Sequence, residues 1–177
     1  ANPKQKLDVK GSVNIMLDSS YRINNYRVLS TKGQTGLYVG YEAGISNTTG
    51  YQNVFAGTLA GSANTTGRDN TFMGAFSGLY NTTGILNTFT GSLSGYENTT
   101  GQANTFCGGQ AGSNNQTGSN NTYVGRWAGA ADSVNSYSTC IGSSAGFKNV
   151  VGYATFVGCN AGVNNTTGTQ NTFIGLN

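Results

Sequence analysis

Few residues in this chain could carry out acid–base or metal chemistry. Its 177 residues include no His and only six acidic side chains, which argues against a Ser-His-Asp triad and against any His-containing metal site. Two of the acids, Asp69 and Glu97, belong to different copies of the repeat described below, whereas a glycosidase needs two carboxylates flanking one bond. The sequence therefore predicts a protein that is not an enzyme and that needs no cofactor or metal.

Three cysteines, Cys107, Cys140 and Cys159, are the remaining reactive side chains. Cys107 and Cys140 are two repeats apart, which is roughly 10 Å at the usual spacing of β-strands. A disulfide spans at most about 7 Å between Cα atoms. We therefore expect the cysteines to be small buried hydrophobic residues, and a disulfide between chains is the alternative.

Aromatic side chains offer the candidates for ligand contacts. Trp127, beside Arg126, departs from the residues that stand at its place in the other repeats. An exposed Trp next to Arg could stack on a sugar ring, and the alternative is that it fills a groove between chains. Tyr80 and Tyr96 are further aromatics expected to point outward. These four residues are the predicted glycan contacts.

A five-residue motif, Asn-Thr-Phe-x-Gly, recurs along the chain and organises everything else. Its copies are 17 residues apart, except for one spacing of 16. Four residues after the motif's Gly comes another Gly, preceded by Ala or Ser, and most copies then continue with Asn-Thr-Thr-Gly. The copies begin at Gly36, Asn53, Asn70, Asn87, Asn104, Asn121, Ser138, Ala154 and Asn171.

Repeats of this length predict a parallel β-solenoid, or β-roll. A 17-residue unit cannot bury its own apolar face, but stacked units can. The composition agrees, because the 28 Gly, 23 Asn and 23 Thr are poor helix formers and only 8% of the residues are charged. We predict an all-β chain with about nine coils over residues 36–177 and a small β-element over residues 1–35.

Local signals predict details of each part. The β-element would cover the edge of the first coil. The three recurring Gly positions predict corners with positive φ, and Asn135, which replaces the third of them, tolerates that conformation. Loosely alternating residues predict the strands of the β-element: Leu7, Val9, Ser12, Val13, Ile15, Tyr21, Ile23, Tyr26 and Val28. A column of Asn predicts a ladder of side-chain amides between coils: Asn53, Asn70, Asn87, Asn104, Asn121 and Asn171.

Alternation along the strand assigns two rows of side chains to opposite faces. A strand that is apolar on both faces is buried on both, and a thin coil supplies only one interior, so the second face predicts association with further copies of the chain. The row expected inside, with the reverse assignment as the alternative, is Tyr38, Phe55, Phe72, Phe89, Phe106, Tyr123, Cys140, Phe156 and Phe173. The row expected at the contact between chains is Val39, Ala56, Met73, Thr90, Cys107, Val124, Ile141, Val157 and Ile174.

Charge and hydropathy limit the partners. The net charge of +3 comes from residues 1–32, which hold six of the nine basic residues, whereas residues 33–177 have a net charge of −1. Such a surface lacks the Lys and Arg clusters that bind nucleic acid, and no run approaches the ~20 apolar residues of a membrane-spanning helix. We expect neither nucleic-acid binding nor membrane insertion. The chain does not begin with Met and stops in mid-pattern, from which we expect a piece of a longer protein.

The repeat over residues 36–177 resembles those of bacterial and phage trimeric fibre proteins. It is similar to the head repeats of trimeric autotransporter adhesins, although the period and the aromatic at the strand centre depart from them. Residues 6–13 and 21–30 resemble the shaft of phage tail fibres, and mosaic adhesive trimer fibres of predatory bacteria are a related group. The resemblance implies a homotrimeric rod that is secreted, at a cell surface or in a virion tail fibre. Such a rod would recognise host or prey through glycans or other envelope components.

Two other functions remain as alternatives. An ice-binding solenoid would use flat arrays of Thr, but the Thr rows of the Asn-Thr-Thr-Gly segments are expected in corners rather than on a flat strand: Thr49, Thr66, Thr83, Thr100, Thr117 and Thr167. A fragment of a glycan-degrading phage tailspike would release reducing sugar from a surface polysaccharide.

Overall fold

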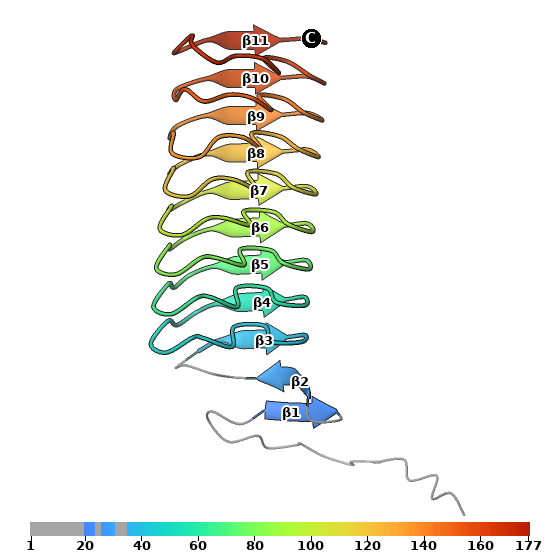
Figure 1. Cartoon of the computed structure of the whole chain (residues 1–177), viewed down its shortest axis with the longest axis vertical. Helices are drawn as coiled ribbons and strands as arrows, with labels where there is room; N and C mark the ends of the chain where they lie inside the picture. The colour runs from blue at the N-terminus through green and yellow to red at the C-terminus, as the bar shows by residue number, and fades with distance from the viewer. Residues whose placement is uncertain (1–19, 24–25, 31–34) are drawn as a thin grey trace, which may run out of the picture.

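The computed structural model describes residues 20–23, 26–30 and 35–177. Within these residues the strands form one eleven-stranded sheet in sequence order, stacked along the long axis of the molecule (Figure 1). No α-helix occurs in the described residues. The all-β prediction is thereby confirmed. The alternating residues predicted as strand before Ser20, from Leu7 to Ile15, lie outside the described residues.

A hairpin precedes the solenoid. Strands β1 (Ser20–Ile23) and β2 (Tyr26–Ser30) pair antiparallel, and β2 then pairs antiparallel with β3. This places β2 on the edge of the first coil, as the sequence predicts. The solenoid strands are β3 (Leu37–Val39), β4 (Val54–Ala56), β5 (Thr71–Met73), β6 (Thr88–Thr90), β7 (Thr105–Cys107), β8 (Thr122–Val124), β9 (Thr139–Ile141), β10 (Thr155–Val157) and β11 (Thr172–Ile174).

The solenoid strands pair in parallel and without a shift of register. Each residue of β4, for example, pairs with the residue 17 positions later in β5, as Phe55 does with Phe72. The one shorter step joins Cys140 of β9 to Phe156 of β10, 16 positions on. Within the described residues, the nine solenoid strands β3 to β11 therefore enclose eight turns of a parallel β-solenoid, which confirms the predicted fold.

A stack of aromatic rings fills the interior. Phe55, Phe72, Phe89 and Phe106 have no exposed surface, and successive ring centroids are 4.8–4.9 Å apart with interplanar angles of 5–9°. This spacing equals the usual distance between paired strands, about 4.7–4.9 Å. The Ala and Ser residues before the second glycine are buried beside the rings. The aromatic row thus lies inside from Tyr38 to Phe156, as predicted, and the reverse assignment is wrong. The prediction fails for Phe173, which is 42% exposed because β11 is the last strand of the stack and no further coil of the described structure covers it.

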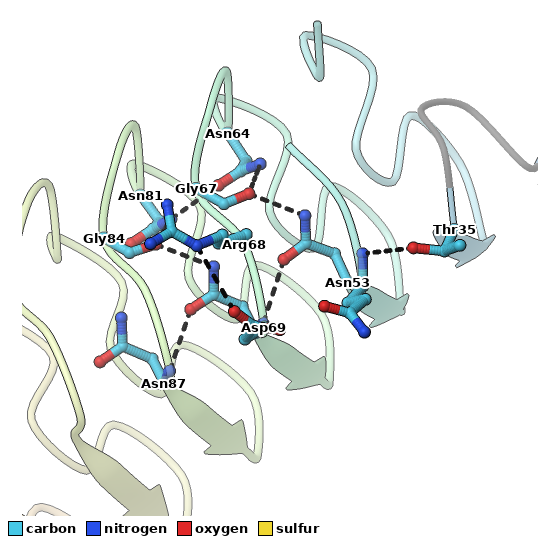
Figure 2. Close-up of polar contacts among 11 residues, drawn as sticks. Thr35, Asn53, Asn64, Gly67, Arg68, Asp69, Asn81, Gly84 and Asn87 are labelled. Atoms are coloured by element: carbon cyan, nitrogen blue, oxygen red, sulfur yellow. Dashed lines mark hydrogen bonds and ion pairs between the residues drawn. The ribbon is translucent and has the colours of Figure 1, made fainter. Parts of the chain in front are cut away.

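Two columns of buried Asn hold the coils together (Figure 2). In the column predicted as a ladder, Asn53 Oδ1 accepts the backbone N–H of Asn70 at 3.1 Å, and Asn53 Nδ2 donates to the Gly67 carbonyl at 2.8 Å. The direct amide ladder is in the Asn-Thr-Thr-Gly column instead, where Asn81 Nδ2 donates to Asn64 Oδ1 at 2.8 Å. The prediction named the wrong column, because a buried amide bonds to whichever group of the next coil faces it.

The recurring glycines serve two different purposes. The first two of each coil have positive φ, such as Gly74 (137°) and Gly78 (57°), as predicted for corners. The third does not: φ of Gly84 is outside the left-handed region, but an added Cβ would lie 2.3 Å from Asn81 Oδ1. Asn135, at the same place in its coil, also lacks a positive φ. The prediction was wrong for this column, where Gly serves for space rather than for conformation.

Each full coil also places two non-glycine residues in the left-handed region. In the coil of β5 these are Phe76 and Leu86, each with φ of 60°. Their backbone N–H groups donate to the carbonyl oxygens of Thr58 (2.8 Å) and Arg68 (3.1 Å) in the preceding coil. Left-handed backbone costs about 1–3 kcal/mol for such residues. The bonds between coils offset that cost, a feature that the sequence did not predict.

Candidate interaction surfaces

The outer face of the sheet carries the row predicted to contact other chains. Side chains on the solenoid strands alternate between outer and inner faces, and the central residue of β3 to β10 is the buried one. Members of the outer row are therefore exposed in the single chain, for example Met73 at 47% and Ile141 at 40%. Val39, Cys107, Val124 and Ile174 are exposed like them, and Ala56, Thr90 and Val157 are half-buried. The sequence placed this row on the outer face correctly, and its contact with other chains stays a prediction.

A second column shares this outer face. The first residue of each strand points to the same side as the third, and from β5 to β11 that residue is Thr in every strand. Neighbouring members pair in register, as Thr88 does with Thr105. The column is Thr71, Thr88, Thr105, Thr122, Thr139, Thr155 and Thr172. The outer face is therefore half apolar and half hydroxyl, and the description of the strand as apolar on both faces is incomplete.

The cysteines are free thiols in different environments. Cys140 is buried in the core, and burial, with the nearby Asp132 carboxylate as the smaller cause, raises the pKa of its thiol to about 12. Cys107 and Cys159 are exposed. The expectation of small buried residues is thus correct for Cys140 and wrong for the other two, since Cys107 lies on the outer face of β7.

Trp127 is held by contacts on several sides. The guanidinium carbon of Arg126 lies 3.6 Å from the centroid of the indole ring, so the cation covers one ring face. Indole Nε1 donates a hydrogen bond to Gln110 Oε1, one coil earlier. The ring of Phe147, one coil later, approaches edge-on with centroids 6.4 Å apart. The predicted pair is present, but Arg126 stacks on Trp127 itself.

A hollow of about 340 Å³ opens beside Trp127. Its apolar lining consists of Trp127, Phe147, Ala130 and Ala131. Its polar lining consists of Gln110, Ser113 and Asn114, all of which are uncharged.

Tyr80 and Tyr96 form a separate aromatic pair. Their ring centroids are 5.1 Å apart with an interplanar angle of 79°, and the hydrogen bond with Tyr80 raises the pKa of Tyr96. A hollow of about 370 Å³ beside Tyr80 includes Glu97 but none of the residues around Trp127. The structure therefore divides the four predicted glycan contacts between two places.

A buried acid interrupts the amide ladder. Asp132 occupies the ladder position that is Asn in every neighbouring coil, and it has no exposed surface. Its Oδ2 accepts the Tyr123 hydroxyl at 2.6 Å, and its Oδ1 accepts the backbone N–H (3.1 Å) and Nδ2 (2.8 Å) of Asn135. In the described part of the chain the buried Asn115 Oδ1 is left without a hydrogen-bond partner.

Burial dominates the ionisation of this pair. It raises the pKa of Asp132, although the hydrogen bonds from Tyr123 and Asn135 act in the opposite direction. Burial and the carboxylate together raise the pKa of Tyr123 well above its ordinary value. The sequence signal was present, since Asp replaces Asn and Tyr replaces Phe in the same coil, but only the fold shows that the two side chains meet.

In the part of the chain that the structure describes, no three His, Cys, Asp or Glu side chains gather in a way that could hold a metal ion. None of the described residues forms a helix of the length and hydropathy needed to cross a membrane. Comparison of the chain with known protein families, with curated proteins and with solved structures finds no match.

Proposed function

We propose that this chain is a non-enzymatic segment of a homotrimeric surface fibre used for adhesion. The observation that carries the proposal is the exposed apolar row on the outer face of a regular parallel sheet. Apolar residues scattered over a surface need no explanation, but a contiguous apolar patch is typical of an interaction site. Here the row continues from Val39 to Ile174, along the whole solenoid.

Geometry favours a second copy of the same chain as the occupant. Strands repeat at one spacing along the rod, so two rods laid side by side meet the same kind of contact at every coil. A partner without this repeat could match only a few coils. The outer face also lacks charged side chains, since its two columns contain only apolar, Thr and Cys residues. Depletion of charge is typical of the core of an interface.

The Thr column fits such an interface because each hydroxyl can both donate and accept a hydrogen bond. Three copies would give a stiff rod whose corners and loops remain available for binding. Those loops carry the two hollows beside Trp127 and Tyr80, which support the proposed contact with glycans or other envelope components. A surface or secreted location, or one in a virion tail fibre, belongs to the same proposal.

An acidic substitution on the outer face tests the assembly. Ile141→Asp or Val124→Asp would bury an unpaired charge at the proposed contact, and we expect either variant to sediment as a monomer in analytical ultracentrifugation. Leu86→Asp is the matched control, because Leu86 is 57% exposed but lies outside the strands. It should assemble like the unmodified chain. Unchanged assembly of both outer-face variants would contradict the proposed contact.

The Thr column on the solenoid strands favours the ice-binding alternative, which the Thr positions in the sequence argued against. The row led by Thr49 lies outside the strands, whereas this column, Thr71 to Thr172, lies on the solenoid strands. This function would need the same outer face to be free of protein. Thermal hysteresis by a monomeric chain would favour ice binding and argue against the fibre. The tailspike alternative stays a prediction, to be tested by release of reducing sugar.

A further inference from the structure

We infer that the hollow beside Trp127 is a binding site for one neutral pyranose ring. The inference deepens the proposed adhesive function and rests on it for the class of ligand. Its volume of about 340 Å³ is at the lower end of the range for small-molecule sites, about 300–1,000 Å³. The space suits one sugar ring and its exocyclic groups rather than a long stretch of polymer.

Small residues create the hollow. Ala130 and Ala131 occupy the repeat positions that Tyr96 and Glu97 occupy in the coil of β6. In the coil of β9, the position of Ala130 is taken by Phe147. Phe147 of the next coil stands on one side of the hollow, and Gln110, Ser113 and Asn114 of the preceding coil stand on the other. This is a local departure from the repeat rather than a property of every coil.

The lining matches the two sides of a pyranose. Sugars present C–H groups on one ring face and hydroxyls around the rim, and aromatic rings bury the former. Trp127 and Phe147 supply the aromatic surface, while Gln110, Ser113 and Asn114 supply amide and hydroxyl groups. Gln110 Oε1 already accepts the hydrogen bond from Trp127 Nε1, so Gln110 would meet a ligand with its amide nitrogen as a donor. A few polar groups in an apolar hollow are typical of ligand sites.

The site is fixed before any ligand arrives. Arg126 stacked on the indole, the Nε1–Gln110 hydrogen bond and the edge of Phe147 restrain Trp127 from three sides. A restrained ring loses little conformational entropy on binding. No charged side chain lines the hollow, and Arg126, the cation beside it, is already stacked on the indole ring, so the lining suits a neutral sugar better than a sugar acid.

Trp127 itself reports on the site, because it is the single Trp of the chain. The probes are the methyl glycosides of glucose, galactose, mannose and N-acetylglucosamine, with methyl glucuronoside as the acidic comparison. We expect a saturable change of tryptophan fluorescence for at least one neutral glycoside, at roughly millimolar concentration, and at least fivefold weaker binding of the glucuronoside. Saturation-transfer NMR on the same glycoside gives a readout independent of the fluorophore.

A filling variant identifies the hollow as the site. Ala131→Tyr should abolish binding because it occupies the space, and the repeat accepts Tyr at this position, as Tyr80 shows. Ser46→Tyr is the matched control at the same repeat position, far along the rod, and should leave binding unchanged. Unchanged thermal unfolding of both variants shows that they fold.

Several results would overturn the inference. They are no response to any neutral glycoside, tighter binding of the glucuronoside, or a response that Ala131→Tyr does not alter. Measuring the solution mass of the same samples separates the two proposals. A trimer that binds no sugar would reject the site and leave the fibre standing, and a monomer that binds sugar would reject the assembly and leave the site standing.

Discussion

At the scale of single residues, exceptions to the repeat are the most informative positions. Asp132 replaces a ladder Asn, and the hydroxyl of Tyr123 meets its carboxylate at 2.6 Å. A carboxylate cannot donate, so the preceding ladder residue, Asn115, keeps an unpartnered Oδ1 in the described structure. An unmade hydrogen bond of a buried group costs about 1–3 kcal/mol. Asp in place of Asn at position 132 therefore removes one hydrogen bond of the amide ladder and forms a buried Asp–Tyr hydrogen bond instead.

We predict that Asp132→Asn, made together with Tyr123→Phe, stabilises the chain at neutral pH, by about 1–2 kcal/mol. The Asn side chain can donate to Asn115 Oδ1 and can still accept from Asn135. Phe in place of Tyr123 removes the hydroxyl, which would otherwise lose its acceptor at Asp132 Oδ2. The folded pKa of Asp132 is raised, so the native chain keeps its full stability below the unfolded pKa and loses it as pH rises through the folded value. The gain from the double substitution should therefore grow with pH. Urea unfolding at a series of pH values measures it, and a variant less stable than the native chain at pH 7 would contradict the argument.

At the third recurring glycine of each coil, we expect the space around an added Cβ, rather than the backbone conformation, to decide whether another residue is tolerated. A Cβ at Gly84 would lie 2.5 Å from the Gly101 carbonyl oxygen as well as close to Asn81, so Gly84→Ala should cost about 1–3 kcal/mol of unfolding free energy. At Gly109 the nearest atom is 4.0 Å from the added Cβ, and the coil of β5 has Ala75 at this place. Gly109→Ala is the control and should be neutral or slightly stabilising. Equal losses in thermal unfolding of the two variants would disprove this distinction.

At the scale of the coil, the strands and the inner row could be predicted from the sequence. Period and alternation suffice for these, because a 17-residue unit must stack and its aromatic row must be buried. The choice between the two Asn columns could not be predicted, since it depends on which group of the next coil faces each amide. Left-handed Phe76 and Leu86 also gave no signal, because neither residue type favours that conformation.

The candidate site divides in the same way. The departure of Trp127 from its column marked the place, and the structure adds the hollow that Ala130 and Ala131 leave beside it. Small residues carry no sequence signal for a cavity until the neighbouring coils are in register. The outer Thr column could not be predicted for a different reason, because Thr is neither apolar nor charged and so marks neither a buried nor an exposed face of a strand.

The coil between β9 and β10, which is one residue shorter than the others, allows a prediction at the scale of the coil. Cys140 stands in the aromatic row, and Phe156 of the next coil fills part of the space that a ring would need, since a Cβ on Gly146 would lie 2.6 Å from Cys140 Sγ and 2.9 Å from the Phe156 ring. Restoring the aromatic with Cys140→Phe should therefore overpack the core and destabilise it by about 1–3 kcal/mol, measured by chemical unfolding. A stabilised variant would mean that the coil can accommodate a regular aromatic stack.

At the scale of the whole molecule, a single rod leaves a long neutral face of apolar and hydroxyl side chains in water. In most proteins a parallel sheet is covered on both faces, so an uncovered outer face is unusual. Association through the outer face would cover Met73, Val124 and Ile141 and leave the loops outside. The proposed adhesive function depends on this assembly, because three aligned rods present each loop site three times and multivalent contact raises avidity.

The solution mass of the unmodified chain, measured by light scattering coupled to size-exclusion chromatography, tests this most directly. The fibre proposal predicts a particle with three times the 18.3 kDa of one chain, unchanged on dilution through the micromolar range. A stable particle of 18.3 kDa, with the row from Val39 to Ile174 open to solvent, would contradict it.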